Sequence, residues 1–177
     1  RFGEMGYLGL AAPASSEDAD VVAEAVLYEE LGRYGTGGVA SAIGYHAGGA
    51  LPLVAAFGRP ELKDRYVKPS LQGEQVGGLA LKEPAGDSAG TLQTVARKEE
   101  NGYRLNGVKT WVINGDVADW VCVSARMEGQ EGVSLFLVDA RAEGFGPKRS
   151  LATLGWRAAG LAEIELRDVF VPAEHRL

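Results

Sequence analysis

The spacing of the apolar residues changes once along the chain, near residue 74, and this change limits the fold more than any other feature. Before it, apolar residues recur three or four positions apart, the period of a helix. Within residues 18–33 this stripe consists of Val21, Val22, Ala25, Tyr28 and Leu31. After it, short apolar runs alternate with turn residues, which is typical of strands. We therefore predict an α+β fold, with a helical N-terminal domain over residues 1–73 and a β-barrel middle domain over residues 74–177.

Glycine and proline divide the helical part into segments. The two serines at 15–16 are N-cap candidates for the first helix. Residues 36–57 are rich in glycine and alanine, and Pro52 within them predicts a buried pair of helices instead of one continuous helix. A further short helix is expected to begin at Pro60 and to end before Pro69.

Short segments in the second half have the composition of strands. They are residues 79–81, 92–96, 103–105, 108–113, 120–125, 133–138 and 164–171. Three Asn-Gly pairs, at 101–102, 106–107 and 114–115, are typical of tight turns between strands. Short strands separated by turns at this spacing predict a sandwich or a barrel.

Composition argues against several classes of function. The formal net charge is −6, whereas proteins that bind nucleic acid or anchor to membranes through basic segments carry a positive surface. A single cysteine, Cys122, permits no internal disulfide, and two histidines far apart in the sequence predict no metal site. We see neither an apolar run of about 18 residues nor a leader, so we expect no membrane span and a cytoplasmic location.

Several short motifs, taken in order, resemble those of the flavin-dependent acyl-CoA dehydrogenases. They are residues 30–33 (ELGR), 57–63 (FGRPELK), 65–66 (RY), 79–84 (LALKEP), 103–109 (YRLNGVK), 111–115 (WVING), 154–157 (LGWR) and 168–172 (DVFVP). The resemblance covers nearly the whole chain, and the order and spacing of the motifs make it specific. It implies a helical N-terminal domain, a β-barrel middle domain and a C-terminal four-helix bundle. The bundle has no counterpart here, so we expect the chain to be a fragment of a longer protein.

The resemblance also implies a reaction. Members of the family dehydrogenate an acyl-CoA thioester: a glutamate removes the α proton, and the β hydrogen leaves as hydride to N5 of FAD. That glutamate lies in the bundle of most members, so no catalytic residue is assigned here and the fragment alone is expected to be inactive. Glu83, beside the flavin-side turn, is expected to be structural. The partners implied are acyl-CoA, further subunits of a homo- or hetero-oligomer, and an electron-transfer flavoprotein.

The cofactor-binding positions that the resemblance implies fall in three short segments. They are Leu79, Leu81 and Lys82 in the strand before Glu-Pro, Gly86, Asp87 and Ser88 in the loop after it, and Trp111, Val112 and Ile113 in the WVING motif. The strand would lie against the flavin ring, the loop near the pyrophosphate, and the indole against the flavin.

Three of these positions depart from the family pattern. Lys82 and Ile113 stand where a threonine is usual, and Asp87 stands where a serine is usual. Isoleucine cannot donate a hydrogen bond to N5, and a carboxylate beside a phosphate is repelled. Two functions therefore stay open: an FAD-dependent acyl-CoA dehydrogenase, and a non-catalytic, flavin-poor subunit or half that completes a heteromeric one. A third reading is a β-barrel binding module for acyl-CoA.

Overall fold

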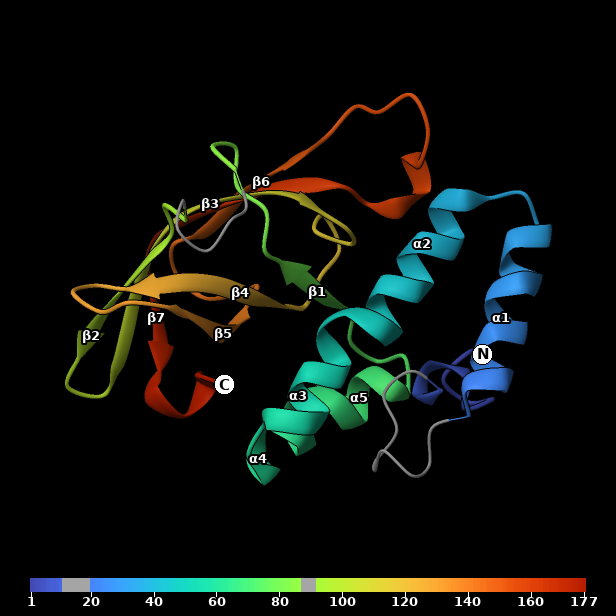
Figure 1. The fold of residues 1–177 in the computed structure, drawn as a ribbon, viewed down its shortest axis with the longest axis horizontal. Helices are drawn as coiled ribbons and strands as arrows, with labels where there is room; N and C mark the ends of the chain where they lie inside the picture. Colours follow the sequence, from blue (N-terminus) through green and yellow to red (C-terminus); the bar gives the residue numbers. More distant parts are fainter. Residues whose placement is uncertain (11–19, 87–91) are drawn as a thin grey trace.

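The computed structural model has helices in its first part and one curled, seven-stranded sheet in its second (Figure 1). It describes residues 1–10, 20–86 and 92–177. The predicted α+β fold, helices first and strands after, is confirmed. The strands that we expected to form a barrel form a curled sheet, with the helical run 37–57 packed along one end of it (Figure 1).

Helix α1 (Val21–Arg33) begins after Asp20, whose side chain accepts a hydrogen bond of 2.9 Å from the Ala23 amide. An aspartate in this position satisfies one of the amide donors that the first turn leaves free. The serines at 15–16, predicted as caps, lie outside the described residues. Val21 and Val22 are 69% and 74% exposed, so this end of the predicted apolar stripe is not buried.

The region 37–57 is one continuous helical run, so the predicted pair of helices is wrong. Helix α2 (Gly37–Tyr45) passes through a π-helical turn (His46–Ala50) into helix α3 (Leu51–Phe57). Pro52 lies in the first turn of α3, directly after the π-helical turn, in which the hydrogen bonds run from i to i+5.

This run of 21 residues is long and apolar enough, by length and composition only, to cross a membrane. Our expectation that no such run exists was therefore wrong. Core helices of soluble proteins pass the same test, so the run does not show a membrane span.

The next helical run also passes through a proline. Helix α4 (Pro60–Leu62), a π-helical turn (Lys63–Val67) and helix α5 (Lys68–Leu71) follow one another without a break. The predicted end before Pro69 is therefore wrong, because this proline occupies the first turn of α5, where a missing N–H is tolerated.

The sheet contains one strand that the sequence did not predict. Its strands are β1 (Gly77–Ala80), β2 (Val95–Glu99), β3 (Gly102–Val112), β4 (Trp120–Met127), β5 (Val133–Asp139), β6 (Phe145–Ser150) and β7 (Ala162–Pro172). Their order is β1-β4-β2-β3-β7-β6, with β5 on the other edge of β4. Strands β1 and β2 both run parallel to β4, and the other pairs are antiparallel. Strand β6 was missed because glycine and proline at 146–147 interrupt its apolar pattern.

The three Asn-Gly pairs play different parts. The pair at 101–102 joins β2 to β3, as predicted. The pair at 106–107 lies inside β3 at a register shift against β7, so the two predicted strands 103–105 and 108–113 are one strand. The third pair follows the end of β3, where Asn114 has a φ of 60°.

Two cores hold the structure together. The first fills the inside of the curled sheet and includes Leu105, Phe136 and Ile164. The second lies between the sheet and the helices, where Tyr66 packs on Trp120 with ring centroids 5.2 Å apart. The helical and β parts therefore share buried apolar surface, and this surface fixes the helices against β4.

Candidate functional site

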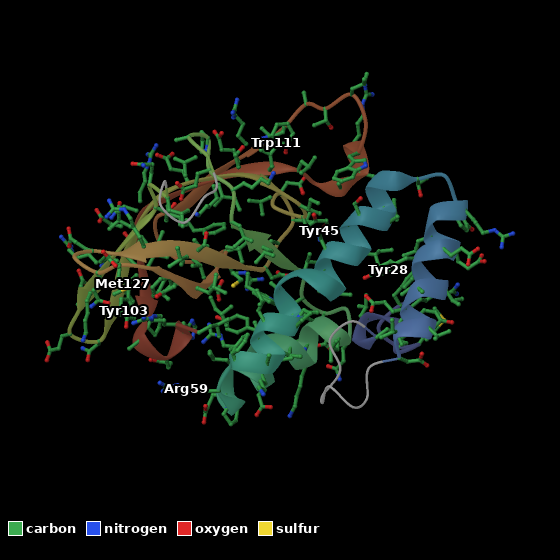
Figure 2. All side chains as sticks on the ribbon, viewed as in Figure 1. Tyr28, Tyr45, Arg59, Tyr103, Trp111 and Met127 are labelled. Carbon is green, nitrogen blue, oxygen red and sulfur yellow. The ribbon has the colours of Figure 1, made fainter. Side chains whose placement is uncertain are left out.

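A cavity of about 660 Å³ lies where the helical run 37–57 meets strands β1 and β3. Its lining residues come from segments far apart in the sequence: Tyr45, Leu79, Leu81, Lys82, Thr110, Trp111, Ile113, Thr153, Gly155, Trp156 and Leu161. Figure 2 shows Trp111 on the sheet and Tyr45 on the helical run that faces it. The volume is in the range of cavities that bind cofactors and small ligands.

Five of the nine predicted cofactor-binding residues line this one cavity. They are Leu79, Leu81, Lys82, Trp111 and Ile113. Residues 79–82 and 111–113 are about thirty positions apart, and only the fold brings them together. Whether these side chains hold a cofactor stays a prediction.

The other four predicted residues are placed differently. The Val112 side chain is fully buried in the core of the sheet and does not line the cavity. Gly86 is described and is not among the lining residues. Asp87 and Ser88 lie outside the described residues.

A β-bulge in β3 explains why the sequence did not reveal Thr110 as a lining residue. In a regular strand, adjacent side chains point to opposite faces, whereas Thr110 and Trp111 both line the cavity. The register with β7 shifts between Lys109 and Val112, and Trp111 has a φ of 55°. This irregularity turns the indole toward the cavity and leaves it 55% exposed.

The loop before β7 supplies a second indole. Trp156 is 50% exposed and has a φ of 58°. It belongs to the motif LGWR, which the resemblance had singled out without giving it a role. Leu161 also lines the cavity. Tyr45 and Thr153 line it as well, and no sequence signal pointed to these two.

The cavity suits a flat aromatic ligand with polar edges. Two indoles and several aliphatic side chains provide apolar faces, while Lys82, Thr110 and Thr153 provide one cation and two hydroxyl groups. Within residues 1–10, 20–86 and 92–177 no group of three or more His, Cys, Asp or Glu side chains is placed to hold a metal ion.

Beside the cavity lies a buried ion pair between Glu83 and Lys109. The Lys109 Nζ atom is 2.7 Å from Glu83 Oε1, and the two side chains are 1% and 0% exposed. Burial alone would raise the pKa of Glu83, but hydrogen bonds from Lys109 and the amides of Gln93 and Thr94 hold that pKa below its ordinary value. Burial lowers the pKa of Lys109, and the adjacent carboxylate offsets part of this effect. These contacts agree with a structural role for Glu83.

His46 links the helical run to the start of β1. Its Nδ1 atom accepts a hydrogen bond of 3.1 Å from the Gly77 amide, and its Nε2 atom donates one of 3.1 Å to the Ser70 carbonyl. The ring must be neutral to accept the first bond. Burial accordingly lowers the pKa of His46.

Asn114 makes a second link between the same parts. Its Nδ2 atom donates a hydrogen bond of 2.8 Å to the Ala42 carbonyl in α2. With His46, this bond holds the helical wall of the cavity against the strands that form the opposite wall.

The chain matches two models of one family. Residues 1–74 match the acyl-CoA dehydrogenase N-terminal domain, and residues 78–169 match the acyl-CoA dehydrogenase middle domain. The short-chain specific acyl-CoA dehydrogenase of Clostridium acetobutylicum is 33% identical over 186 residues, which cover 100% of this chain and 48% of that protein. The chain thus has the N-terminal and middle domains of an acyl-CoA dehydrogenase and belongs to this family.

Solved structures agree with this assignment. Acyl-CoA dehydrogenase from Geobacillus kaustophilus superposes with a TM-score of 0.84 at 31% identity, covering 99% of this chain and 49% of that one. An acyl-CoA dehydrogenase complexed with FAD from Bacillus anthracis superposes with a TM-score of 0.87 at 34% identity, covering 99% of this chain and 30% of that one. The chain therefore spans about half the length of the Clostridium acetobutylicum and Geobacillus kaustophilus proteins and 30% of the Bacillus anthracis one.

Proposed function

We propose that this chain forms the flavin-facing part of an FAD-dependent acyl-CoA dehydrogenase that introduces an α,β double bond into an acyl-CoA thioester. The convergence of residues 79–82 and 111–113 on one cavity carries this proposal. The cavity has the size and the aromatic lining that an isoalloxazine ring requires. The FAD complex of the Bacillus anthracis relative supports the same cofactor.

The residues of this chain would bind and orient the ring. When bound, FAD supplies the hydride acceptor, and the protein supplies position and electrostatics. Trp111 offers a half-exposed aromatic face for stacking, and Leu79 and Leu81 add apolar side chains to the cavity wall. Lys82 adds a cation that favours negative charge on a bound ring. The base that removes the α proton is proposed to lie outside this chain.

One observation favours a second candidate, a flavin-poor subunit that completes a heteromeric dehydrogenase with a flavin-binding partner. Ile113 is buried and lines the cavity at the position where the family pattern has a hydroxyl group. An isoleucine leaves a polar edge of the ring unpaired and lowers affinity for flavin.

The visible absorbance of the purified full-length protein separates the two candidates. An enzyme holds FAD after dialysis and loses its flavin absorbance when an acyl-CoA is added without oxygen. Absence of flavin, persisting after incubation with excess FAD, would support the second candidate. Flavin that stays oxidised with acyl-CoAs of every chain length would contradict the proposed reaction.

A further inference from the structure

The buried Glu83–Lys109 pair lies beside two strand-side walls of the cavity, one formed by residues 81–82 and the other by residues 110–111. Neither side chain of the pair is part of the lining. Glu83 directly follows the lining residues 81–82, and Lys109 directly precedes the lining residues 110–111. We propose that Glu83 and Lys109 are positioning residues, which fix the distance between these two walls and so shape the cavity for its ligand. This inference rests on the proposed flavin function.

The side chain of Lys109 holds the backbone of the first wall, residues 81–82, at the Leu81 carbonyl. The ammonium group has three protons and meets three acceptors: Glu83 Oε1 at 2.7 Å, Ser124 Oγ at 3.0 Å and the Leu81 carbonyl at 3.2 Å. A fully used ammonium group has one orientation. Ser124 Oγ donates a further bond of 3.3 Å to the same Leu81 carbonyl. The backbone of this wall is therefore held by side chains of β3 and β4.

A backbone hydrogen bond continues this attachment toward the second wall. The Thr110 amide donates to the Lys82 carbonyl at 2.9 Å, so a lining residue of each wall is bonded to the other. Thr110 directly follows Lys109 in the sequence, and Lys82 directly follows Leu81, whose carbonyl Lys109 contacts. A shift of the Lys109 ammonium would therefore move both partners of the bond.

Glu83 extends the attachment to a third stretch of chain. Its carboxylate accepts hydrogen bonds from the Gln93 amide and, at 3.0 Å, from the Thr94 amide. Residue 83 and residues 93–94 are thereby joined across ten positions of sequence. Arg126 Nε supports the same stretch with a bond of 3.2 Å to the Leu92 carbonyl.

The bulge that carries Trp111 begins at Lys109. Lys109 lies opposite Ile164 of β7, and Val112 lies opposite Ala162, so two residues of β3 face one of β7. An irregular segment of this kind has no ladder of its own to keep it in place. Lys109 is the last regularly paired residue before it, and its three bonds give the segment a fixed starting point.

A general role in stability is the competing explanation. Replacing a buried ion pair by apolar groups is often neutral for stability, while such pairs in some proteins define a unique arrangement. A positioning role predicts local effects, at the amides that the pair holds. A purely stabilising role predicts effects spread over the whole sheet.

The test compares Lys109→Met with the parent in the full-length protein. We expect hydrogen exchange to accelerate at least tenfold at the amides of Gln93, Thr94 and Thr110, with the β4–β5 ladder unchanged. We expect the dissociation constant for FAD, measured by quenching of flavin fluorescence, to rise at least tenfold. Arg97→Met is the matched control, because it breaks an exposed pair with Glu99 (3.2 Å) on the same sheet and should change neither quantity.

If Lys109→Met does not fold, Ser124→Ala serves in its place. It removes one acceptor of the ammonium group and keeps both charges, so exchange at Thr110 should still accelerate. Unchanged exchange at the three amides, or an even rise over the whole sheet, would overturn the inference. A parent protein that binds no FAD would refute the proposed function, and the exchange result would still decide the inference.

Discussion

At the scale of single residues, the cavity lining departs from the pattern that the resemblance implies at Lys82 and at Ile113. The position of Ile113 in the WVING motif was visible in the sequence, and the structure places its side chain in the cavity wall. The neighbouring Thr110 could not be identified in this way, because its orientation depends on a bulge that no residue type marks. A hydrophobic pattern predicts which face of the sheet a side chain occupies only where successive side chains alternate regularly between the two faces.

Restoring a hydroxyl group at position 113 should strengthen flavin binding. Ile113→Thr replaces an apolar side chain beside the ring by a hydrogen-bond donor, which is worth about 1 kcal/mol, or roughly fivefold in affinity. The dissociation constant for FAD can be measured by quenching of flavin fluorescence. Ile113→Val is the control, since it has the size of threonine without the hydroxyl group. Equal affinities of the two variants would show that the hydroxyl group plays no part.

His46 should make stability depend on pH. Because its pKa is lowered in the folded state, the folded protein binds fewer protons than the unfolded one below the unfolded value near 6.5. The free energy of unfolding should therefore fall as the pH drops below about 6.5, with a slope of at most about 1.4 kcal/mol per pH unit. Burial also lowers the pKa of His175, so this residue should likewise make the free energy of unfolding fall as the pH drops.

The contribution of His46 can be isolated with His46→Gln. Urea unfolding of parent and variant at several pH values gives the difference between their free energies of unfolding. This difference should shrink as the pH falls from 7 to 5. A difference that does not change with pH would show that folding does not shift the pKa of His46.

At the scale of secondary-structure elements, the sequence predicted which segments are helices and strands better than it predicted where they join. Prolines 52 and 69 were expected to interrupt helices, but each lies in a first turn that follows a π-helical turn. Segments 103–105 and 108–113 merged because Asn106-Gly107 forms a bulge instead of a hairpin. In each case, the residue types allow more than one local conformation, so the local sequence does not decide where the element ends.

The contact between α2 and the turn Arg157–Ala159 should tolerate no added methyl group. A Cβ atom at Gly38 would lie 2.9 Å from the Ala158 backbone nitrogen, so Gly38→Ala must push the helix away from the cavity loop. We expect a loss of about 1–3 kcal/mol in the free energy of unfolding. Gly32→Ala in α1 is the control, because its Cβ atom would meet nothing within 4 Å and should stabilise the helix by about 0.5–1 kcal/mol. Similar effects of both substitutions on urea unfolding would contradict this account.

At the scale of the whole molecule, the helical and β parts have separate sequence signatures but a joint core. The sequence showed the change of period near residue 74, and we keep the domain boundary between residues 73 and 74 as a proposal. It gave no sign of the contacts across this boundary. The bond from Trp120 Nε1 to Ser70 Oγ (3.2 Å) and the bond from Asn114 to Ala42 depend on how the parts pack. Patterns within a segment report its local structure, and contacts between segments require the three-dimensional fold.

This joint core predicts that both parts unfold together. Leu51 in α3 is fully buried in a cluster that also contains Trp120, Cys122 and Leu137 of the sheet. Leu51→Ala should therefore lower the free energy of unfolding by about 2–5 kcal/mol, and the loss should appear in the sheet as well as in the helices. Urea unfolding followed by circular dichroism at 222 nm, by tryptophan fluorescence and by hydrogen exchange of β4 should give one shifted midpoint. Val39→Ala, at a position 41% exposed on α2, should shift none of them appreciably. A shift seen only in the helical signal, with β4 exchange unchanged, would show that the parts are independent domains and that the cavity between them can open without unfolding the sheet.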